Sequence, residues 1–315
     1  MSTSLFRLSC TAGLLAASTL VAHAAIERSV EKTFPVTAAG TVRIETQGGA
    51  IKVSPGADGT VRVIAKQKIR AGSEAEADEL LKKLELTFEQ AGNDVTAISK
   101  YEKRGSGFFM GSWPPVTVEF VVTVPAGFAT QLNTSGGNIS VGDLNGKVVA
   151  RTSGGSITLG QMGGTVDART SGGNVALAGA TGEVELKTSG GNITAGKVSG
   201  AAELSTSGGS IKIDSASGRL RAQTSGGSVR AKITGALTGD SELSTSGGSV
   251  TATVDKTAAF RLDASTSGGS VDADGLTITL EGSNKSRSRL AGAVNGGGPM
   301  LKLRSSGGNI SIRAN

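Results

Sequence analysis

The sequence predicts an all-β protein whose larger part is a parallel β-solenoid with rungs of about 18 residues. Three observations lead to this prediction: a TSGG-type block recurs, apolar and polar residues alternate after it, and prolines are nearly absent from the repeats. A fixed period of this size indicates units that are stable only when stacked on their neighbours. The blocks begin at Thr134, Thr152, Thr170, Thr188, Thr206, Thr224, Thr245, Thr266 and Ser305.

Each repeat contains two short stretches in which apolar and polar residues alternate. In the copy that begins at Thr152, Ile157 and Leu159 form the first stretch, and Val166 and Ala168 form the second. A period of two is typical of a β-strand with one buried face. Eighteen residues leave no room for a crossover helix, so each strand should pair in parallel with its equivalent in the next repeat. The expected inward columns are Ile139, Ile157, Val175, Ile193, Ile211, Val229, Val250, Val271 and Ile310 on one strand, and Val148, Val166, Val184, Ala202, Leu220 and Leu262 on the other.

Glycines mark two corners in each regular rung. Gly154 and Gly155 represent the first corner, and the second lies near Gly164. Such positions need a positive φ or a close approach of two backbones. The threonine that opens each block continues the inward alternation, so its hydroxyl should bond to the corner backbone at the edge of the core. Between residues 126 and 300 the only proline is Pro299, as expected for rungs that are hydrogen bonded on both sides.

The spacing of the blocks changes toward the C-terminus. The first five steps are 18 residues, the next two are 21, and the last, from Thr266 to Ser305, is 39. Because 39 equals one step of each kind, we expect one degenerate rung near Asn284. The block at Ser305 would then form the last rung of the solenoid. The last strand has no obvious cover, so either its short length and Arg313 protect its edge or it pairs with another molecule.

Residues 1–24 have the features of a secretory signal peptide. Arg7 supplies a positive charge, an apolar stretch follows, and Ala22-His23-Ala24 offers a cleavage site. We therefore expect export to the periplasm or the cell surface, with no transmembrane segment left after cleavage. Cleavage would remove Cys10 and His23, the only cysteine and the only histidine. The mature chain would then have no disulfide, no Cys or His metal site and no histidine-dependent catalytic triad.

Residues 25–133 are expected to form a β-rich N-terminal region that caps the repeats of residues 134–315. The stretch around Thr46 resembles a first rung. A capping helix is predicted at about 73–84, because Ser73 and Glu76 have the spacing of a capping box ahead of three leucines. This helix is a candidate for the lid over the open apolar end of the solenoid.

A segment rich in glycine and proline, residues 105–115, carries the aromatic residues Phe108, Phe109 and Trp113. Aromatic side chains on such a loop can stack on sugars or enter the surface of a partner. They can equally plug the end of the solenoid, and both interpretations stay open.

Outward-facing charges should form stripes along the stack. Like charges one rung apart, at about 4.8 Å, repel each other, so neighbouring stripes of opposite sign should offset one another diagonally. The net charge of the chain is only +6, which is too small to indicate nucleic-acid binding. One stripe holds Asp167, Glu185, Glu203, Glu242 and Asp263, interrupted by Arg221, and its neighbour holds Arg151, Arg169 and Lys187.

The TSGG[NS][IV] blocks, a preceding V-x-V-P strand at residues 122–125 and the EAEADELLKKLEL helix together resemble a bacterial domain family of unknown function that carries the label putative adhesin. The resemblance covers roughly residues 40–315. It implies a right-handed β-solenoid in an exported or envelope-associated protein. It brings with it no catalytic residue and no cofactor.

These features favour a non-catalytic, exported scaffold that binds an envelope glycan or protein. Its candidate binding surface is the aromatic segment or a periodic polar stripe that includes Asn138, Asn174 and Asn192. One alternative is a polysaccharide-active enzyme, which would need carboxylates gathered in a groove. Asp272 and Asp274 are the candidates for that role or for binding calcium. The other alternative is a self-assembling solenoid that polymerises through its terminal rung.

Overall fold

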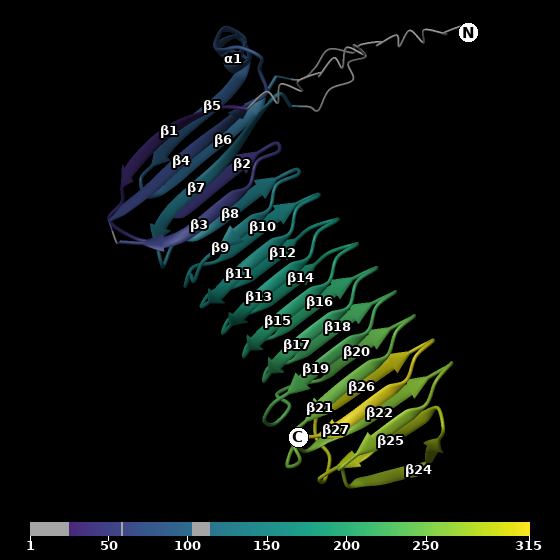
Figure 1. Ribbon diagram of the computed structural model, residues 1–315. Coiled ribbons are helices and arrows are strands. Elements are labelled where there is room, and N and C mark those ends of the chain that lie inside the picture. Colours follow the sequence, from purple (N-terminus) through teal and green to yellow (C-terminus); the bar gives the residue numbers. More distant parts are fainter. Residues whose placement is uncertain (1–24, 58, 103–113) are drawn as a thin grey trace, which may run out of the picture.

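The computed structural model describes residues 25–57, 59–102 and 114–315, and these residues form a two-sheet parallel β-solenoid (Figure 1). Within them, thirteen strands make up sheet A and fourteen make up sheet B. The inward side chains of both sheets join in one continuous apolar core. In spatial order, sheet A contains β1 (Ile26–Pro35), β4 (Thr60–Ile69), β7 (Val116–Pro125), β3 (Ile51–Gly56), β9 (Ile139–Val141), β11 (Ile157–Met162), β13 (Val175–Ala180), β15 (Ile193–Val198), β17 (Ile211–Ala216), β19 (Val229–Ile233), β21 (Val250–Val254), β27 (Ile310–Ala314) and β23 (Val271–Asp274). Sheet B contains β24 (Ile278–Ser286), β25 (Arg289–Val294), β22 (Phe260–Thr266), β26 (Met300–Ser305), β20 (Ser241–Thr245), β18 (Leu220–Thr224), β16 (Ala202–Thr206), β14 (Val184–Lys187), β12 (Val166–Arg169), β10 (Val148–Thr152), β8 (Ala129–Thr134), β2 (Thr41–Thr46), β6 (Asp94–Tyr101) and β5 (Leu84–Ala91).

The central rungs confirm the predicted parallel register. Ile157 lies beside Val175, and Val166 lies beside Val184, so equivalent residues 18 positions apart are direct neighbours. All four side chains are almost fully buried. The predicted inward columns are buried in the same way, except that Val271, in the edge strand β23, is half-buried.

The threonine that opens each block forms the predicted column at the edge of the core. The Thr152 hydroxyl donates to the carbonyl oxygen of Gly137 at 2.9 Å and accepts from the Gly155 N–H at 3.2 Å. Each hydroxyl thus closes its own corner and binds the corner of the preceding rung. The same two bonds recur at Thr134, Thr170, Thr188, Thr206, Thr224, Thr245 and Ser305.

Close backbone approach, and not positive φ, explains the corner glycines. A Cβ atom placed on Gly155 would lie 2.0 Å from the carbonyl oxygen of Gly137, and one on Gly164 would lie 2.5 Å from that of Gly146. Neither Gly155 nor Gly164 has a positive φ. Only a residue without a side chain lets successive corners stack at this distance.

The N-terminal region continues both sheets of the solenoid. The stretch around Thr46 forms the predicted first rung, because β2 pairs in parallel with β8 and β3 with β9. Beyond that rung, β6 and β7 extend the sheets in parallel. The antiparallel strands β5, β4 and β1 then complete this end of the molecule.

The helix α1 (Glu74–Leu81) begins where the capping box predicts. The Ser73 hydroxyl accepts from the Glu76 N–H at 3.2 Å, and the Glu76 carboxylate accepts from the Gly72 N–H at 2.7 Å. Contrary to expectation, α1 does not cover the apolar end of the core. Its one buried residue, Ala77, packs in a separate small cluster with Tyr101 and others at a corner of the molecule.

Side chains of the outermost strands cover the end of the core in place of the helix. Phe34 from β1, and Leu86 and Phe88 from β5, pack partly buried against the main core cluster. An eight-residue helix with a single buried side chain offers too little apolar surface for this task.

The C-terminal part of the chain overturns two expectations. The block at Ser305 is not the last rung, because β26 lies between β20 and β22, and β27 lies between β21 and β23. The segment around Asn284 is not a degenerate rung either. It belongs to β24, which pairs antiparallel with β25, and β25 in turn covers the edge of β22. The rung expected to be bare is therefore hydrogen bonded on both sides and offers no free strand edge to another molecule.

Candidate binding surface

Outward-facing charges on sheet B form a ladder of ion pairs, as the two stripes predict. Asp167 contacts Arg151 at 3.1 Å and Arg169 at 2.8 Å. Arg169 also contacts Glu185 at 2.8 Å, and Lys187 bridges Glu185 and Glu203, with 3.3 Å to the latter. Each of these basic groups thus lies between two acidic groups or beside one, which offsets the repulsion within each stripe.

The ladder keeps Glu185, Arg169 and Lys187 ionised. Hydrogen bonds from Lys187 and Arg169 lower the pKa of Glu185, although partial burial opposes the shift. The hydrogen bond to Glu185 raises the pKa of Arg169 and that of Lys187. All three shifts lead away from neutrality, so these groups are fixed charges and not proton donors or acceptors near pH 7.

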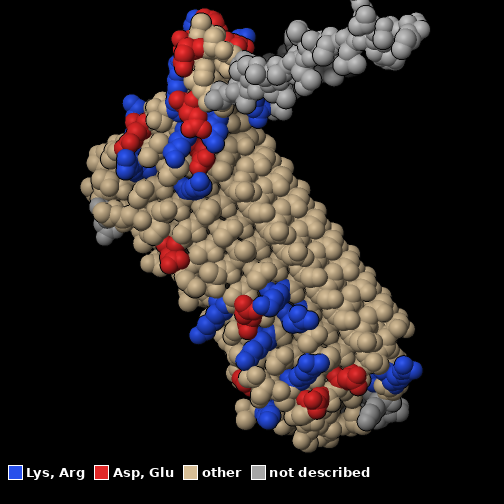
Figure 2. All heavy atoms as spheres, viewed as in Figure 1, with Lys and Arg blue, Asp and Glu red and all other residues tan. Residues whose placement is uncertain are grey.

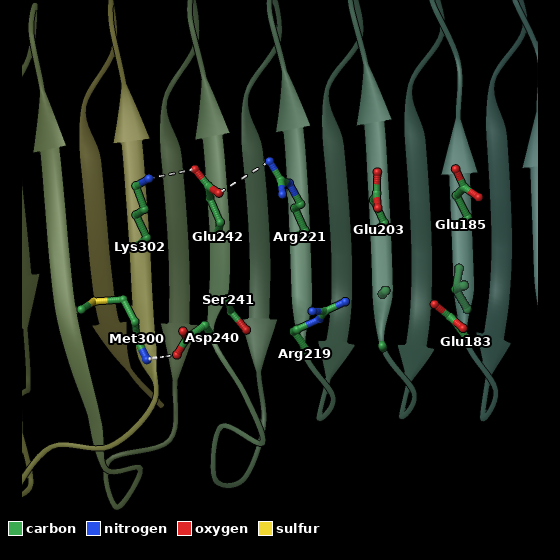
Figure 3. Close-up of a pocket in the computed structure, with 13 residues that line it drawn as sticks. Glu183, Glu185, Glu203, Arg219, Arg221, Asp240, Ser241, Glu242, Met300 and Lys302 are labelled. Atoms are coloured by element: carbon green, nitrogen blue, oxygen red, sulfur yellow. Dashed lines mark hydrogen bonds and ion pairs between the residues drawn. The ribbon is translucent and has the colours of Figure 1, made fainter.

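A shallow hollow of about 360 Å³ lies beside the ladder, where β14, β16, β18, β20 and β26 are neighbours (Figure 3). The small side chain of Ala201 leaves the space, and longer side chains of neighbouring strands surround it. Arg219 extends from the N-terminal end of β18 toward β16 (Figure 3). We call this hollow the sheet B groove. Its charged lining consists of Glu183, Glu185, Glu203, Arg219, Arg221, Asp240, Glu242 and Lys302.

Charges of both signs alternate along one side of the sheet B groove. Arg221 on β18 contacts Glu242 on β20 at 3.9 Å, and Glu242 contacts Lys302 on β26 at 3.5 Å. The side chains of Arg221 and Lys302 are 56% and 44% exposed, so both can reach a ligand. This arrangement can bind acidic and basic groups of one ligand at the same time.

Sequence reasoning missed the groove, and Lys302 shows why. Lys302 enters the stripe only because β26 is inserted between β20 and β22. One signal was available in the sequence. If the rungs stacked in the order of the chain, Glu242 would lie beside Asp263 and the two carboxylates would repel each other. Placing a rung with a basic residue between them removes this repulsion. Arg219 carried no signal, because the groove beside it exists only where Ala201 is small.

The predicted polar stripe serves the stack itself. The Asn138 side-chain oxygen accepts from the Ser156 N–H at 2.8 Å, and that of Asn192 accepts from the Ser210 N–H at 2.7 Å. Asn174 accepts from the Asn192 N–H at 2.8 Å. These three side chains remain exposed, but their acceptor oxygens join consecutive rungs.

Asp272 and Asp274 lie exposed on the edge strand β23, opposite Ser311 and Arg313 of β27. Among the described residues, no group of three or more His, Cys, Asp or Glu side chains could hold a metal ion.

Phe108, Phe109 and Trp113 lie outside the described residues. No helix in the described part of the chain has the length and apolar character needed to cross a membrane.

Charge is spread unevenly over the surface. The face drawn in Figure 2 carries charges toward both ends and few along the middle of the repeats. On sheet A, one outward column is uncharged over four rungs, at Ser140, Thr158, Ala176 and Thr194, and charges follow in the next rungs, as at Lys212 and Asp214. The ion-pair ladder and the groove therefore distinguish sheet B as the candidate binding surface.

Comparison with known proteins supports the fold. The family model described as Toastrack DUF4097 matches residues 50–313, which is more than half of the chain. No curated protein matches. A solved structure of a putative adhesin from Parabacteroides distasonis is 13% identical with a TM-score of 0.51, covering 90% of this chain and 97% of its own.

Two further solved structures have lower TM-scores. A putative adhesin from Parabacteroides merdae is 11% identical with a TM-score of 0.47, covering 90% of this chain and 96% of its own. A putative lipid binding protein from Parabacteroides distasonis is 12% identical with a TM-score of 0.46, with the same two coverages. At these identities the likeness concerns the fold alone.

Proposed function

The chain belongs to the Toastrack DUF4097 family, and from that premise we propose that it is an exported, non-catalytic binding scaffold of the cell envelope. Its partner is an envelope glycan or protein that presents both acidic and basic groups, and the contact surface is the sheet B groove. The signal-like residues 1–24 support export. The adhesin name of the similar structure from Parabacteroides distasonis is consistent with a role in attachment.

The observation that carries this proposal is the fixed alternation of charge beside the groove. Arg221, Glu242 and Lys302 stand on three neighbouring strands, about 4.8 Å apart. Because the strands are hydrogen bonded on both sides, the spacing of these charges is rigid. A partner with charges of matching spacing can bind with little ordering of the protein.

The protonation behaviour of Glu185 favours binding over acid catalysis by this residue. A general acid on this surface would need a carboxyl group whose pKa is raised toward neutrality. Glu185, which lines the groove, has its pKa lowered by Lys187 and Arg169. It therefore serves as a constant negative charge for a basic group of the partner.

A paired substitution on β18 tests the proposal. Arg219→Gln/Arg221→Gln in the mature chain should weaken binding to isolated envelope material about tenfold or more, because two charge-assisted contacts are lost. The matched control is Arg230→Gln/Lys232→Gln on β19, which removes the same charge with the same spacing in sheet A. Binding is measured by sedimentation of the labelled protein with peptidoglycan and membrane fractions.

The control decides between a specific groove and general charge attraction. Equal loss in both double variants would assign binding to net charge, and no loss in the β18 variant would remove the groove from the contact surface. Either result contradicts the proposal.

A further inference from the structure

The chain leaves one position of the stack empty and fills it last. After β20 and β21, the linker of residues 255–259 carries the chain past one position, so that β22 and β23 form two places further on. The hairpin β24–β25 follows, and only then does the chain return to insert β26 and β27. We call the vacancy between β20–β21 and β22–β23 the slot, and residues 300–314 the inserted rung.

The slot holds the inserted rung by the bonds that join any two rungs. Ser305 lies beside Thr245 on one side and Thr266 on the other. Its hydroxyl donates to the Gly248 carbonyl oxygen at 2.9 Å, and the Thr266 hydroxyl donates to the Gly308 carbonyl oxygen at 2.7 Å. These contacts are mostly made by backbone and by residues of the common block, so they do not depend on which copy of the chain supplies the rung.

Charge makes the slot selective for this particular rung. Its sheet B walls carry Glu242 on β20 and both Arg261 and Asp263 on β22, whereas the inserted rung carries Lys302, Arg304 and Arg313 and no acidic residue. Lys302 contacts Glu242 at 3.5 Å, and Arg304 forms an ion pair with the Asp263 carboxylate and donates to its carbonyl oxygen at 2.7 Å. A basic rung thus enters with one carboxylate beside it on each side.

The connection to the inserted rung is a short hinge with one residue under backbone strain. Asn295 has a φ of 49°, the left-handed region that costs a side-chain-bearing residue energy, and Gly296 and Gly297 continue the turn at 89° and 85°, which glycine adopts freely. The Asn295 amide donates to the carbonyl oxygens of Lys256 at 2.7 Å and Ala258 at 3.0 Å. The closed hinge therefore rests on the linker that passes the slot. Short strained hinges favour the exchange of a terminal element between copies.

We propose that the slot is a strand-exchange site for a second copy of this chain. Two copies exchange their inserted rungs reciprocally, so that each slot is filled by the partner's residues 300–314 with the same hydrogen bonds and ion pairs. Opening the hinge relieves the left-handed turn, and no surface is left uncovered. This dimer differs from end-to-end growth, because both stacks remain complete.

A disulfide across the slot distinguishes the two topologies. Ser244 on β20 lies beside Arg304 on β26, so Ser244→Cys/Arg304→Cys, with Cys10 replaced by Ser, places one cysteine in the slot wall and one in the inserted rung. The full chain is unfolded, refolded at increasing concentration, oxidised and analysed on a non-reducing gel. A tethered rung competes at an effective concentration of about millimolar, so the linked dimer should increase roughly in proportion to protein concentration.

The control pair is Ser205→Cys/Gln223→Cys, which joins β16 and β18, rungs that follow directly in the chain. It should stay monomeric at every concentration. A monomer at all concentrations for the slot pair overturns the proposal. So does an equal amount of dimer for the control pair, because that would mean unspecific cross-linking.

A charge-exchanged pair tests the same point without oxidation. One chain carries Glu242→Lys/Asp263→Lys and the other Lys302→Glu/Arg304→Asp, so each rung is repelled by its own slot and attracted by the other chain's slot. Co-expressed with different tags, the two chains should co-purify at least about tenfold more than either variant does with a tagged copy of itself. Absence of this preference contradicts the exchange.

Discussion

Two adjacent glycines in one TSGG block have very different surroundings. A Cβ atom on Gly154 would be 3.8 Å from its nearest neighbour, whereas one on Gly155 would be 2.0 Å from a backbone oxygen and 2.4 Å from the attached carbon. Both face the preceding corner, but only the second is pressed against it. The stack of rungs therefore requires glycine at the position of Gly155, whereas alanine would fit at the position of Gly154.

Gly155→Ala should lower the free energy of unfolding by about 3 kcal/mol, because backbone atoms cannot move aside and the rungs must separate. Gly154→Ala should change the free energy of unfolding by less than about 1 kcal/mol. Alanine lowers the conformational entropy of the unfolded chain, and this stabilising effect offsets the small cost of the added methyl group in the folded protein. Urea titration followed by circular dichroism measures both. Equal effects of the two substitutions would contradict the close-approach explanation.

Two threonines of β8 differ in the same way. The Thr130 side chain is fully buried between Val42 and Val148, and its hydroxyl has no hydrogen-bond partner. The Thr134 hydroxyl donates to the Gly49 carbonyl oxygen at 2.9 Å and accepts from the Gly137 N–H. An unsatisfied buried hydroxyl is costly, and a satisfied one stabilises.

Thr130→Val should therefore raise the free energy of unfolding by about 1 kcal/mol, and Thr134→Val should lower it by about 1–3 kcal/mol. The substitution is the same in both cases and the positions are four residues apart. Thermal denaturation of the two variants beside the parent protein gives the comparison. A destabilised Thr130→Val variant would indicate a partner for this hydroxyl.

At the scale of the element, the ion-pair ladder of sheet B fixes how stability depends on pH. The folded pKa of Glu185 is below its usual value of 4.5, so its contribution is present above that pH and is lost as the pH falls through the folded pKa. The folded pKa of Lys187 is above its usual value of 10.5, so its contribution is present below that pH and is lost as the pH rises through the folded pKa.

The melting temperature should consequently stay level between about pH 5.5 and 9.5 as far as the ladder is concerned, and fall below about pH 4.5. Glu185→Gln should reduce the fall on the acid side, because the variant has no carboxylate to protonate there. Salt at about 1 M should narrow the difference between variant and parent at pH 7, because it screens partly exposed pairs. An unchanged acid profile in the variant would show that Glu185 does not contribute.

At the scale of the whole molecule, local signals predicted each rung but not the order of the rungs. Ile157 and Val175 could be paired from the sequence because their spacing and neighbours repeat, and Ser73 could be recognised because a helix cap is local. The block at Ser305 fits equally well at the end of the stack or inside it, since its contacts to either neighbour are the same. Its place depends on the length of the linker of residues 255–259 and on the hairpin β24–β25. Neither segment follows the repeat, so the period of the sequence could not predict where the rung lies.

The candidate site was predicted only in part for the same reason. The charge stripes followed from residues 18 apart and were confirmed at Arg169 and Glu185. The groove needed Lys302 from the inserted rung and the small side chain of Ala201, and neither has a motif. Asn138 stays a candidate, because a polar residue at a corner has the same spacing whether it binds a ligand or the next rung.

The late insertion of residues 300–314 has a consequence for synthesis. A ribosome that stops before residue 300 would release a chain with two finished coils facing an unfilled gap, each with unpaired N–H and C=O groups. Such a product should aggregate and be cleaved by proteases more readily than a chain that contains the inserted rung. One short segment, residues 300–314, therefore closes both sheets at once, because β26 joins β20 to β22 and β27 joins β21 to β23.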